Sequence, residues 1–600
     1  MSDADRAPRA AAPQPLAAPE YRFGSRDLGL CAAVVLLFAL PLAAQSVRGA
    51  LIAAQVTVGA LGPIRGLAVV IIPFGAAAYF IVRQRIGWGW KLAACCGGLI
   101  GWAIVCQMLL TGETVSIPDL SFGRRTPVAA AAALMALGSF RWGRDRHLPL
   151  VAAAIFALSL FIALRQLWFG PLIGDIYLYQ QGLWNTIHGG GLFFVSDEGG
   201  SHFGTHFSPA LFALLPIYAL WPSAVPLLIT QSAALAASAF PVHALVRRHW
   251  SEGEALALTA GFLLLPPVLG PTLWLFHEAS YGLAAFLAAL LHFERRRAAP
   301  FAVFAALSLT VKETFIIPLA LFSLYAAVRR RGWLWVALPA VSAAIYGAVV
   351  FGLIMPHCRT TESGRPFRYL YGYLGYSPGA AARYLASHPE RTARLLSRGR
   401  NRTYLEQMAA PYGYLLPLSS WPTAFGAPDA LAVLLARPSP WPVRDPTAHY
   451  SMLIAAALFV AFTYSAAALA RRLRSSRTPA ALAAALFFIA AAVGGLQTVA
   501  RYSSVLSAEA VTARRRLTAM IPQPASVVTT WAAASYLANR REIYIEREGR
   551  LSSLRPDYYL GFHRRDTVEA RAAITAVGYR LAASRGGFEL WRREGGLPGR

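Results

Sequence analysis

RRRAAPFAVFAALSLTVKETFIIPLALFSLYAAVRRR, residues 295–331, decides the fold class of this chain. An arginine triplet bounds each end, and only Lys312 and Glu313 interrupt the 31 largely apolar residues between the triplets. Cytoplasmic loops of membrane proteins carry an excess of arginine and lysine. Both ends therefore belong on the cytoplasmic side, and the segment crosses the membrane an even number of times. We predict a hairpin of two short spans whose outer tip carries the charged pair.

Composition places the rest of the chain in a membrane as well. Hydrophobic residues make up 56% of the 600 residues and charged residues only 14%, and the mean hydropathy is +0.46. A transmembrane helix needs about 20 mostly apolar residues. Outside the hairpin, stretches that meet or approach this length lie at residues 28–47, 66–82, 90–110, 127–140, 148–164, 224–246, 255–274, 281–293, 333–354, 449–470 and 479–496. We predict an α-helical polytopic membrane protein of about 13 transmembrane helices.

The basic residues set the expected orientation. The net charge is +27, yet the arginines separate apolar spans and form no single aromatic-studded face, which argues against nucleic acid as a partner. The positive-inside rule predicts that the short arginine-rich segments between the spans are cytoplasmic. We expect a protein of the bacterial cytoplasmic membrane, in contact with membrane lipids. Residues 1–27 are then a disordered cytoplasmic N-terminus, residues 28–147 hold four N-terminal spans, and residues 148–496 form the membrane core.

Two long segments of the core are expected on the extracytoplasmic side. Residues 165–207 follow a span that leaves the cytoplasm, and residues 208–221 are too short to cross and predict an interfacial helix. Residues 355–414 carry nine arginines against three glutamates, which favours anionic partners such as a lipid phosphate. A solvated basic loop on anionic lipid is the favoured alternative. The prolines of residues 415–436 predict a broken or re-entrant helix.

The last hundred residues change character. Residues 526–531, 542–545, 557–561 and 588–592 resemble strands, and residues 532–539 and 568–577 resemble helices. We predict a small extracytoplasmic α/β domain over residues 497–600. It contains no phosphate-binding glycine loop and no nucleophile elbow. A role in substrate binding or in structure is therefore favoured over a second active site.

Three polar clusters are expected to converge on the outer face. They are Asp175 with His188 and His206, His277 with Glu278, and Lys312 with Glu313. Charged groups at membrane depth are costly unless they are paired or hydrated, and they often mark functional sites. An acid at the mouth of a membrane bundle is a candidate catalyst, and the three clusters are candidates to line one cavity.

A metal site is the weaker interpretation of one histidine pair. His202 and His206 have the spacing of two ligands on one helical turn, and Asp197 and Glu198 lie close in sequence. Gly204 between the histidines weakens the helix that this spacing needs. We assign no metal ligand and no cofactor, and a divalent metal stays the alternative.

The order of these motifs resembles a known family. The matching elements are residues 175–184, His206-Phe207-Ser208-Pro209, Pro216-Ile217-Tyr218, Phe276-His277-Glu278 and Lys312-Glu313. Over roughly residues 161–548 they are similar to the domain of unknown function 2079 (DUF2079) family of predicted membrane proteins. This resemblance implies a polytopic membrane fold, and the family brings no assigned activity with it.

A more distant likeness bears on mechanism. In GT-C glycosyltransferases, which use lipid-phosphate-linked sugars, a span leads into an outer loop with a catalytic acid, a proline-containing juxtamembrane helix and a second span with a basic end. Asp175, residues 206–221 and residues 224–248 follow this order. The likeness implies a GT-C-like core, with a polyprenyl-phosphate-sugar donor as partner and Asp175 as catalytic base. The expected substrate-binding residues are His206, His277, Glu278, Lys312 and Glu313, with Lys312 on the phosphate.

Other interpretations remain open at this point. Asp175 precedes a helix and is a candidate N-cap, and Lys312 and Glu313 are candidates for an ion pair that closes the hairpin. Polar helix caps are an alternative for His277 and Glu278. For the whole protein, the alternatives to an enzyme are a polytopic transporter, whose buried charges form a solute pathway, and a noncatalytic envelope scaffold.

Overall fold

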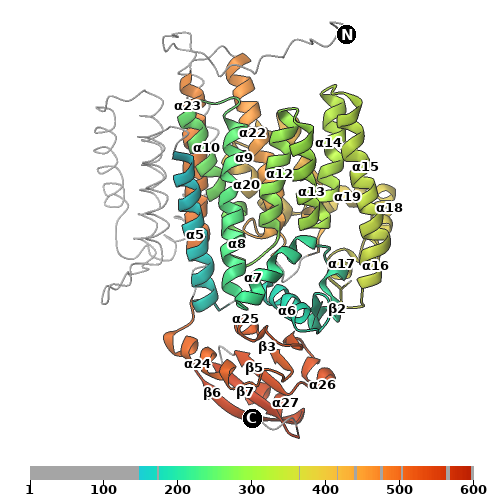
Figure 1. Cartoon of the computed structure of the whole chain (residues 1–600), viewed down its shortest axis with the longest axis vertical. Coiled ribbons are helices and arrows are strands. Elements are labelled where there is room, and N and C mark those ends of the chain that lie inside the picture. Colours follow the sequence, from blue (N-terminus) through green and yellow to red (C-terminus); the bar gives the residue numbers. More distant parts are fainter. Residues whose placement is uncertain are drawn as a thin grey trace, which may run out of the picture.

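The computed structural model describes residues 147–171, 174–363, 365–414, 416–437, 442–472, 477–501, 505–562 and 568–595. The expected cytoplasmic N-terminus and the four spans of residues 28–147 lie outside the described residues, so the total of about 13 transmembrane helices stays a prediction. Figure 1 shows a bundle of helices with a smaller α/β domain at one end.

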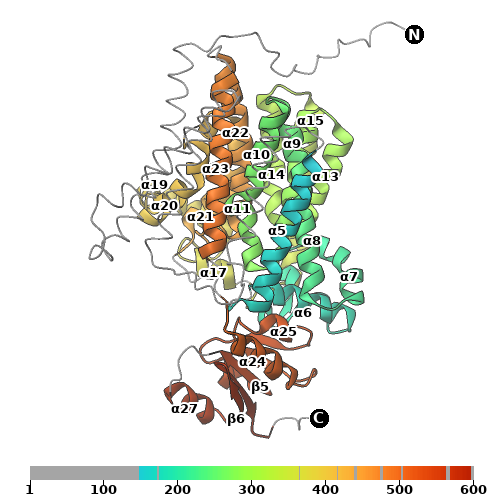
Figure 2. The same cartoon turned by 90° about the vertical axis from the view of Figure 1, so that its left-hand side faces the viewer.

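Within the described residues, four helices are long and apolar enough to cross a membrane. They are α5 (Leu148–Phe169), α8 and α9 together (Ala224–Ala237 and Ala239–Val246), the continuous helix that begins with α15 (Trp333–Val349) and ends with α16 (Met355–Cys358), and α22 (Met452–Arg472) with the turn before it. These match four predicted spans. The predicted span at residues 479–496 lies in α23 (Arg477–Arg501), whose apolar part is shorter. Figure 2 shows α22 and α23 side by side.

The predicted span at residues 255–274 is broken. It consists of α10 (Glu252–Leu264), followed by α11 (Pro266–Leu269) and a 3-10 turn (Gly270–Trp274), with a bend of 56° between the two parts. Pro266 and Pro267 explain the break, because proline cannot supply the backbone N–H that a continuous helix needs. The predicted apolar segment is therefore present, as two helical parts that meet at a bend.

The hairpin predicted from the arginine triplets is present. It consists of α13 (Ala298–Val311), a 3-10 turn (Glu313–Phe315) and α14 (Ile316–Val328), and α12 (Ala279–Glu294) precedes it. Phenylalanines from α12, α13, α14 and the segment before α21 pack in tilted and edge-to-face pairs in the core, with ring centroids 4.7–5.7 Å apart: Phe286, Phe293, Phe301, Phe322 and Phe425. Such aromatic pairs favour close packing beyond simple burial.

The predicted interfacial segment is also helical and short. A 3-10 helix (Pro209–Leu214) leads into α7 (Leu215–Leu220) at the end of the bundle that faces the α/β domain (Figure 1). Leu220 is 89% exposed and Trp221 52%. Apolar side chains on the surface of this short helix suit contact with lipid or another apolar partner.

The segment predicted as an outer loop at residues 355–414 is mostly helical. After α16 it forms α17 (Arg365–Tyr371), α18 (Pro378–Ser387), α19 (Pro389–Leu396) and α20 (Gly399–Ala409). The next segment is broken as predicted, into two 3-10 turns (Leu416–Ser419 and Trp421–Gly426) and α21 (Ala427–Leu435). Its prolines at the starts of these short elements account for the breaks.

The C-terminal region forms the predicted α/β domain. Its five-stranded sheet has the order β4-β3-β5-β7-β6, in which β4, β3 and β5 are parallel and β7 is antiparallel to both neighbours. The strands are β3 (Val527–Thr529), β4 (Ile543–Ile545), β5 (Tyr558–Phe562), β6 (Tyr579–Arg585) and β7 (Phe588–Arg593), and the helices are α24 (Ala508–Ala519), α25 (Ala534–Leu537), α26 (Arg550–Leu554) and α27 (Val568–Ala576). Only β6 and the two helices α24 and α26 were not predicted.

Buried polar contacts hold this domain against the bundle. The guanidinium of Arg514 on α24 donates to the carbonyl oxygens of Trp168 at 2.6 Å and Gly170 at 3.1 Å, at the end of α5. The edge strand β4 is capped by the bundle side, since the backbone N–H of Ile543 donates to Ser196 and that of Ile545 to Asp197. Covering the free N–H groups of an edge strand prevents pairing with other chains, and here it fixes the domain beside the residues that follow α6.

Candidate functional site

Asp175 is placed by a close contact between two loops. It directly precedes α6 (Ile176–Ile187), and its neighbour Gly174 touches the end of the broken span. A Cβ on Gly174 would lie 2.5 Å from the Trp274 carbonyl oxygen, so only glycine fits there. The Asp175 side chain makes no N-cap hydrogen bond, and the capping interpretation is therefore wrong. Its carboxylate has no hydrogen bond or ion pair with any described residue.

The surroundings of Asp175 favour its protonated form. Asp175 is exposed to solvent, although protein surrounds the position closely. This crowding raises the pKa of Asp175, and the Glu278 carboxylate raises it further, while the Lys312 ammonium acts in the opposite direction. Asp175 is thus an accessible carboxyl group whose proton affinity is increased by its environment.

Glu278 is the centre of the buried cluster beside Asp175. It is fully buried, and Lys312 Nζ lies 2.8 Å from one carboxylate oxygen while His277 Nδ1 lies 3.1 Å from the other. The hydroxyl of Tyr179 on α6 donates to the same carboxylate. A buried carboxylate needs such partners, because desolvation of an unpaired charge is expensive. Residues separated widely in sequence are thereby joined at the tip of the hairpin between α13 and α14.

Glu313 has a different partner from its neighbour Lys312. Its carboxylate accepts a hydrogen bond from the backbone N–H of Phe207 at 3.0 Å and lies 2.8 Å from His206 Nδ1. The interpretation of Lys312 and Glu313 as an ion pair that closes the hairpin is therefore wrong. Lys312 pairs with Glu278, and Glu313 pairs with His206. The His206 side chain is 35% exposed, and it contacts Glu313 through Nδ1.

His277 is held from two sides. Its backbone N–H donates to Gln231 Oε1 at 2.5 Å, and the amide of Gln231 donates to the Leu275 carbonyl at 2.6 Å. Leu275 has a positive φ of 69°, an uncommon conformation for leucine. The His277 ring stacks on His449, with centroids 3.4 Å apart. Gln231 and His449 come from distant helices, and neither was expected from the sequence.

The histidine pair considered for a metal is used in other ways. His202 Nδ1 lies 2.9 Å from Glu198, His206 binds Glu313, and Asp197 pairs with Arg550 of the α/β domain. Burial lowers the pKa of His202, but the Glu198 carboxylate outweighs it, so the pKa is raised overall. Among the described residues no group of three or more histidine, cysteine or acidic side chains is arranged to hold a metal ion.

His188 does not join the other candidates. It ends α6 on an exposed position, and its ring stacks on Trp184 with centroids 3.6 Å apart. By contrast, Lys312 and His277 contact Glu278 and His206 contacts Glu313, on the side of the bundle that meets the α/β domain. Asp175 lies beside this cluster without a hydrogen bond or ion pair to a described residue. Tyr179 was missed, although it lies four residues after Asp175, in the first turn of α6.

Comparison with known proteins gives a family and a distant likeness in fold. No protein of curated function matches the chain. The crystal structure of ArnT from Cupriavidus metallidurans bound to undecaprenyl phosphate is 11% identical, covers 75% of this chain and 99% of that chain, and has a TM-score of 0.44. The crystal structure of the same protein in the apo state is 12% identical, covers 75% of this chain and 98% of that chain, and has a TM-score of 0.43.

A family match includes the whole candidate site. The model of a family described as predicted membrane protein (DUF2079) matches residues 175–568. This range begins at Asp175, contains the Glu278 cluster and ends within the α/β domain. The chain is an integral membrane protein and belongs to the DUF2079 family.

Proposed function

We propose that this chain is a glycosyltransferase that moves a sugar from a polyprenyl-phosphate-linked donor to an acceptor at the extracytoplasmic face of the membrane, within a GT-C-like core. The observation that carries the proposal is Asp175, an accessible carboxylate without a partner among the described residues, beside a buried cluster of charges. The α/β domain then lies on the extracytoplasmic side with it.

Asp175 is proposed as the general base. Its carboxylate takes the proton of the acceptor hydroxyl while the acceptor oxygen forms a bond to the anomeric carbon of the sugar. The bond between that carbon and the phosphate oxygen breaks, and polyprenyl phosphate leaves with the electron pair. A base is most effective when its pKa lies near the working pH, and the raised pKa of Asp175 moves it in that direction.

The buried cluster is proposed to serve the departing phosphate. Lys312 is the lysine of the cluster, and its ammonium is held 2.8 Å from Glu278, which fixes its position before the reaction. Preorganised positive groups stabilise negative charge that develops in a transition state. We assign donor binding to Lys312, to Glu278, which holds it, and to His277, which contacts Glu278. His206, which Glu313 orients, completes the set.

The neighbouring surface suits a lipid donor. The helix α7 contacts α6 and exposes the apolar side chains of Ile217 and Leu220. A polyprenyl chain lying along this surface brings its phosphate toward the start of α6. The apolar chain contributes about 0.8 kcal/mol for each buried CH₂ group, so this contact is a source of donor affinity that is independent of the sugar.

Native mass spectrometry of the full-length protein in nanodiscs tests the proposal. Polyprenyl-phosphate sugars are titrated onto the wild type, Asp175→Asn and the control Glu406→Gln, an exposed acid whose partner is Arg402. We expect all three to bind donor with similar affinity. A folded wild type that binds no polyprenyl-phosphate sugar refutes the proposal, and solute flux into liposomes free of such lipids then favours a transporter.

A further inference from the structure

A second charged site lies at the opposite end of the bundle. The ends of α9, α12 and α14 that point away from the α/β domain surround a cavity of about 450 Å³ (Figure 1). Small-molecule sites commonly occupy 300 to 1,000 Å³, roughly the same range. Five arginines line the cavity, with Glu294 as its one acidic lining residue. The excess of positive charge indicates that an anion belongs here.

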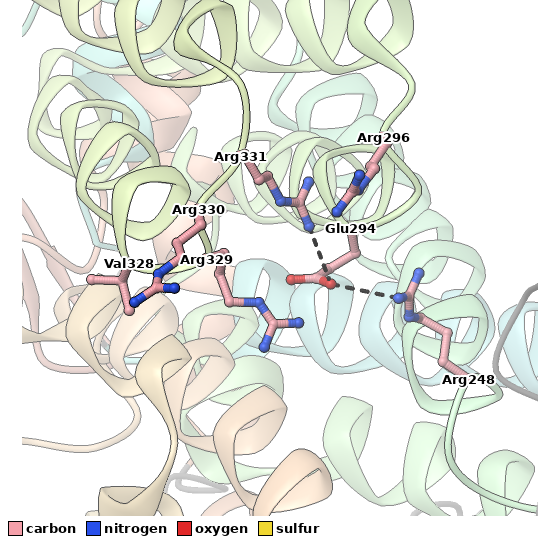
Figure 3. A pocket seen from close by; sticks show the side chains of 7 residues that line it. All are labelled: Arg248, Glu294, Arg296, Val328, Arg329, Arg330 and Arg331. Carbon is pink, nitrogen blue, oxygen red and sulfur yellow. Dashed lines mark ion pairs between the residues drawn. The ribbon is translucent and has the colours of Figure 1, made fainter. Parts of the chain in front are cut away.

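The inner part of this cavity is already organised. Glu294 is buried and accepts a hydrogen bond from Tyr325 at 2.6 Å, and its carboxylate lies 3.5 Å from Arg248 and 3.6 Å from Arg331. Figure 3 shows these two ion pairs converging from opposite sides. The Arg331 guanidinium also lies 4.0 Å from the centre of the Phe293 ring. These contacts fix two guanidinium groups at the cavity wall.

Those two groups keep unused donors. The Nε–H of Arg331 and that of Arg248 are buried and have no acceptor. The Arg331 side chain is only 5% exposed, so water from the bulk does not readily replace the missing acceptor. Buried donors without a partner are rare and costly. A ligand with several acceptor oxygens would satisfy them.

The rim adds three further arginines without carboxylate partners. Arg296, Arg329 and Arg330 are exposed and form no ion pair with a described residue. Arg296 and Arg330 have positive φ values of 56° and 48°, in matching turns after α12 and α14. Glycine is the residue that such helix ends favour, and strained positions of this kind gather at ligand sites. Arginine stands there at a conformational cost, which a ligand contact explains.

We propose that this cavity binds a phosphate or pyrophosphate group, from a soluble anion or from a lipid headgroup. Guanidinium groups bind phosphate oxygens through paired hydrogen bonds. The rim arginines neutralise the anion, and the inner pair offers the unused N–H donors. This site shares no residue with the proposed transferase site, so either can fail without the other.

Inorganic pyrophosphate is the probe for the soluble source. Its binding to the full-length protein in detergent is measured by calorimetry for the wild type, the triple variant Arg296→Gln/Arg329→Gln/Arg330→Gln and the control Arg471→Gln/Arg472→Gln. The control arginines are exposed at the end of α22 and do not line the cavity. We expect the triple variant to bind at least tenfold more weakly and the control to stay within twofold of the wild type. Arg329→Gln alone, which changes no positive-φ residue, is the second variant if the triple variant does not fold.

Nanodiscs test the lipid source. Phosphatidylglycerol retained by each variant is counted by native mass spectrometry, with phosphatidylcholine discs as the reference. Suppose that pyrophosphate does not bind. If the wild type and the control then retain phosphatidylglycerol and the triple variant loses it, the ligand of the cavity is a lipid headgroup. Equal binding of both probes by the triple variant and the control overturns the proposal, as does a wild type that binds neither.

Discussion

The two ends of the bundle use the same device with opposite charge balance. At each end a buried glutamate accepts a hydrogen bond from a tyrosine and pairs with two basic side chains: Glu278 with Lys312 and His277, and Glu294 with Arg248 and Arg331. Near Glu278 the charge left over is the carboxylate of Asp175. Around Glu294 it is a group of arginines. At both ends the buried carboxylate positions its neighbours, whereas the unpaired charge beside it determines which ligand or proton the site can take.

The largest expected effect is at Glu278. In Glu278→Ala the buried Lys312 and His277 lose their partner, and removing one member of a buried pair costs about 3–5 kcal/mol. The free energy of unfolding in detergent measures this loss. Glu278→Gln keeps the size and the bond from Tyr179, so it should lose less. Equal losses in the two variants would mean that packing, and not charge, dominates this end.

A smaller loss is expected at Glu294. Arg248 is 22% exposed and faces the cavity, so water can hydrate its guanidinium when the carboxylate is removed. We expect Glu294→Ala to cost about 1–3 kcal/mol in the same measurement. If this end holds an anion, phosphate in the buffer should reduce the loss, because it replaces the missing negative charge. A loss at Glu294 that exceeds the loss at Glu278 would break the comparison.

The pH dependence of stability tests the unpaired acid. Because the folded state raises the pKa of Asp175, the folded protein holds this proton more tightly than the unfolded chain does. Its contribution to stability is present at low pH and is lost as pH rises through the raised pKa. Thermal melts between pH 4 and 8 should show that Tm falls less with rising pH in Asp175→Asn than in the wild type. A slope unchanged from the wild type would contradict the raised pKa.

The smallest change in the free energy of unfolding is expected at an exposed ion pair, which serves as the reference for the larger losses. Arg402 and Glu406 lie 2.8 Å apart on α20, with side chains 82% and 45% exposed. Exposed pairs of this spacing contribute about 0.3–0.5 kcal/mol, and Arg402→Ala should change the free energy of unfolding by no more than that. A loss of several kcal/mol would show that α20 has a tertiary contact through this arginine.

Much of the architecture was predictable, because hydropathy and charge act locally. The arginine triplets and apolar runs predicted the hairpin of residues 298–328, and short runs of β-branched and aromatic residues predicted four of the five strands. The edge strand β6 was missed because only Tyr579 in it is buried, so its sequence lacks such a run. The helices α17 to α20 were missed because each is short, at 7 to 11 residues, and carries little apolar sequence to mark it.

The sequence predicted which charged residues form the site but not which of them contact each other. Asp175, Glu278 and Lys312 stand out as polar residues within apolar sequence. Their partners depend on tertiary packing, which brings Lys312 to Glu278 and not to its neighbour Glu313. Gln231 and His449 lie within or beside apolar helices and carry no local signal. Neutral polar residues of this kind are found only when the fold places them.

Release of polyprenyl phosphate tests the central proposal most directly. Wild type and Asp175→Asn are incubated in nanodiscs with a donor that both bind, with envelope extract as the acceptor source, and the lipid product is quantified by mass spectrometry. Since general bases contribute about 10²- to 10⁴-fold in rate, we predict a loss of at least a hundredfold in Asp175→Asn, with donor binding retained. Equal release by the two proteins would contradict the assignment of Asp175 as the base.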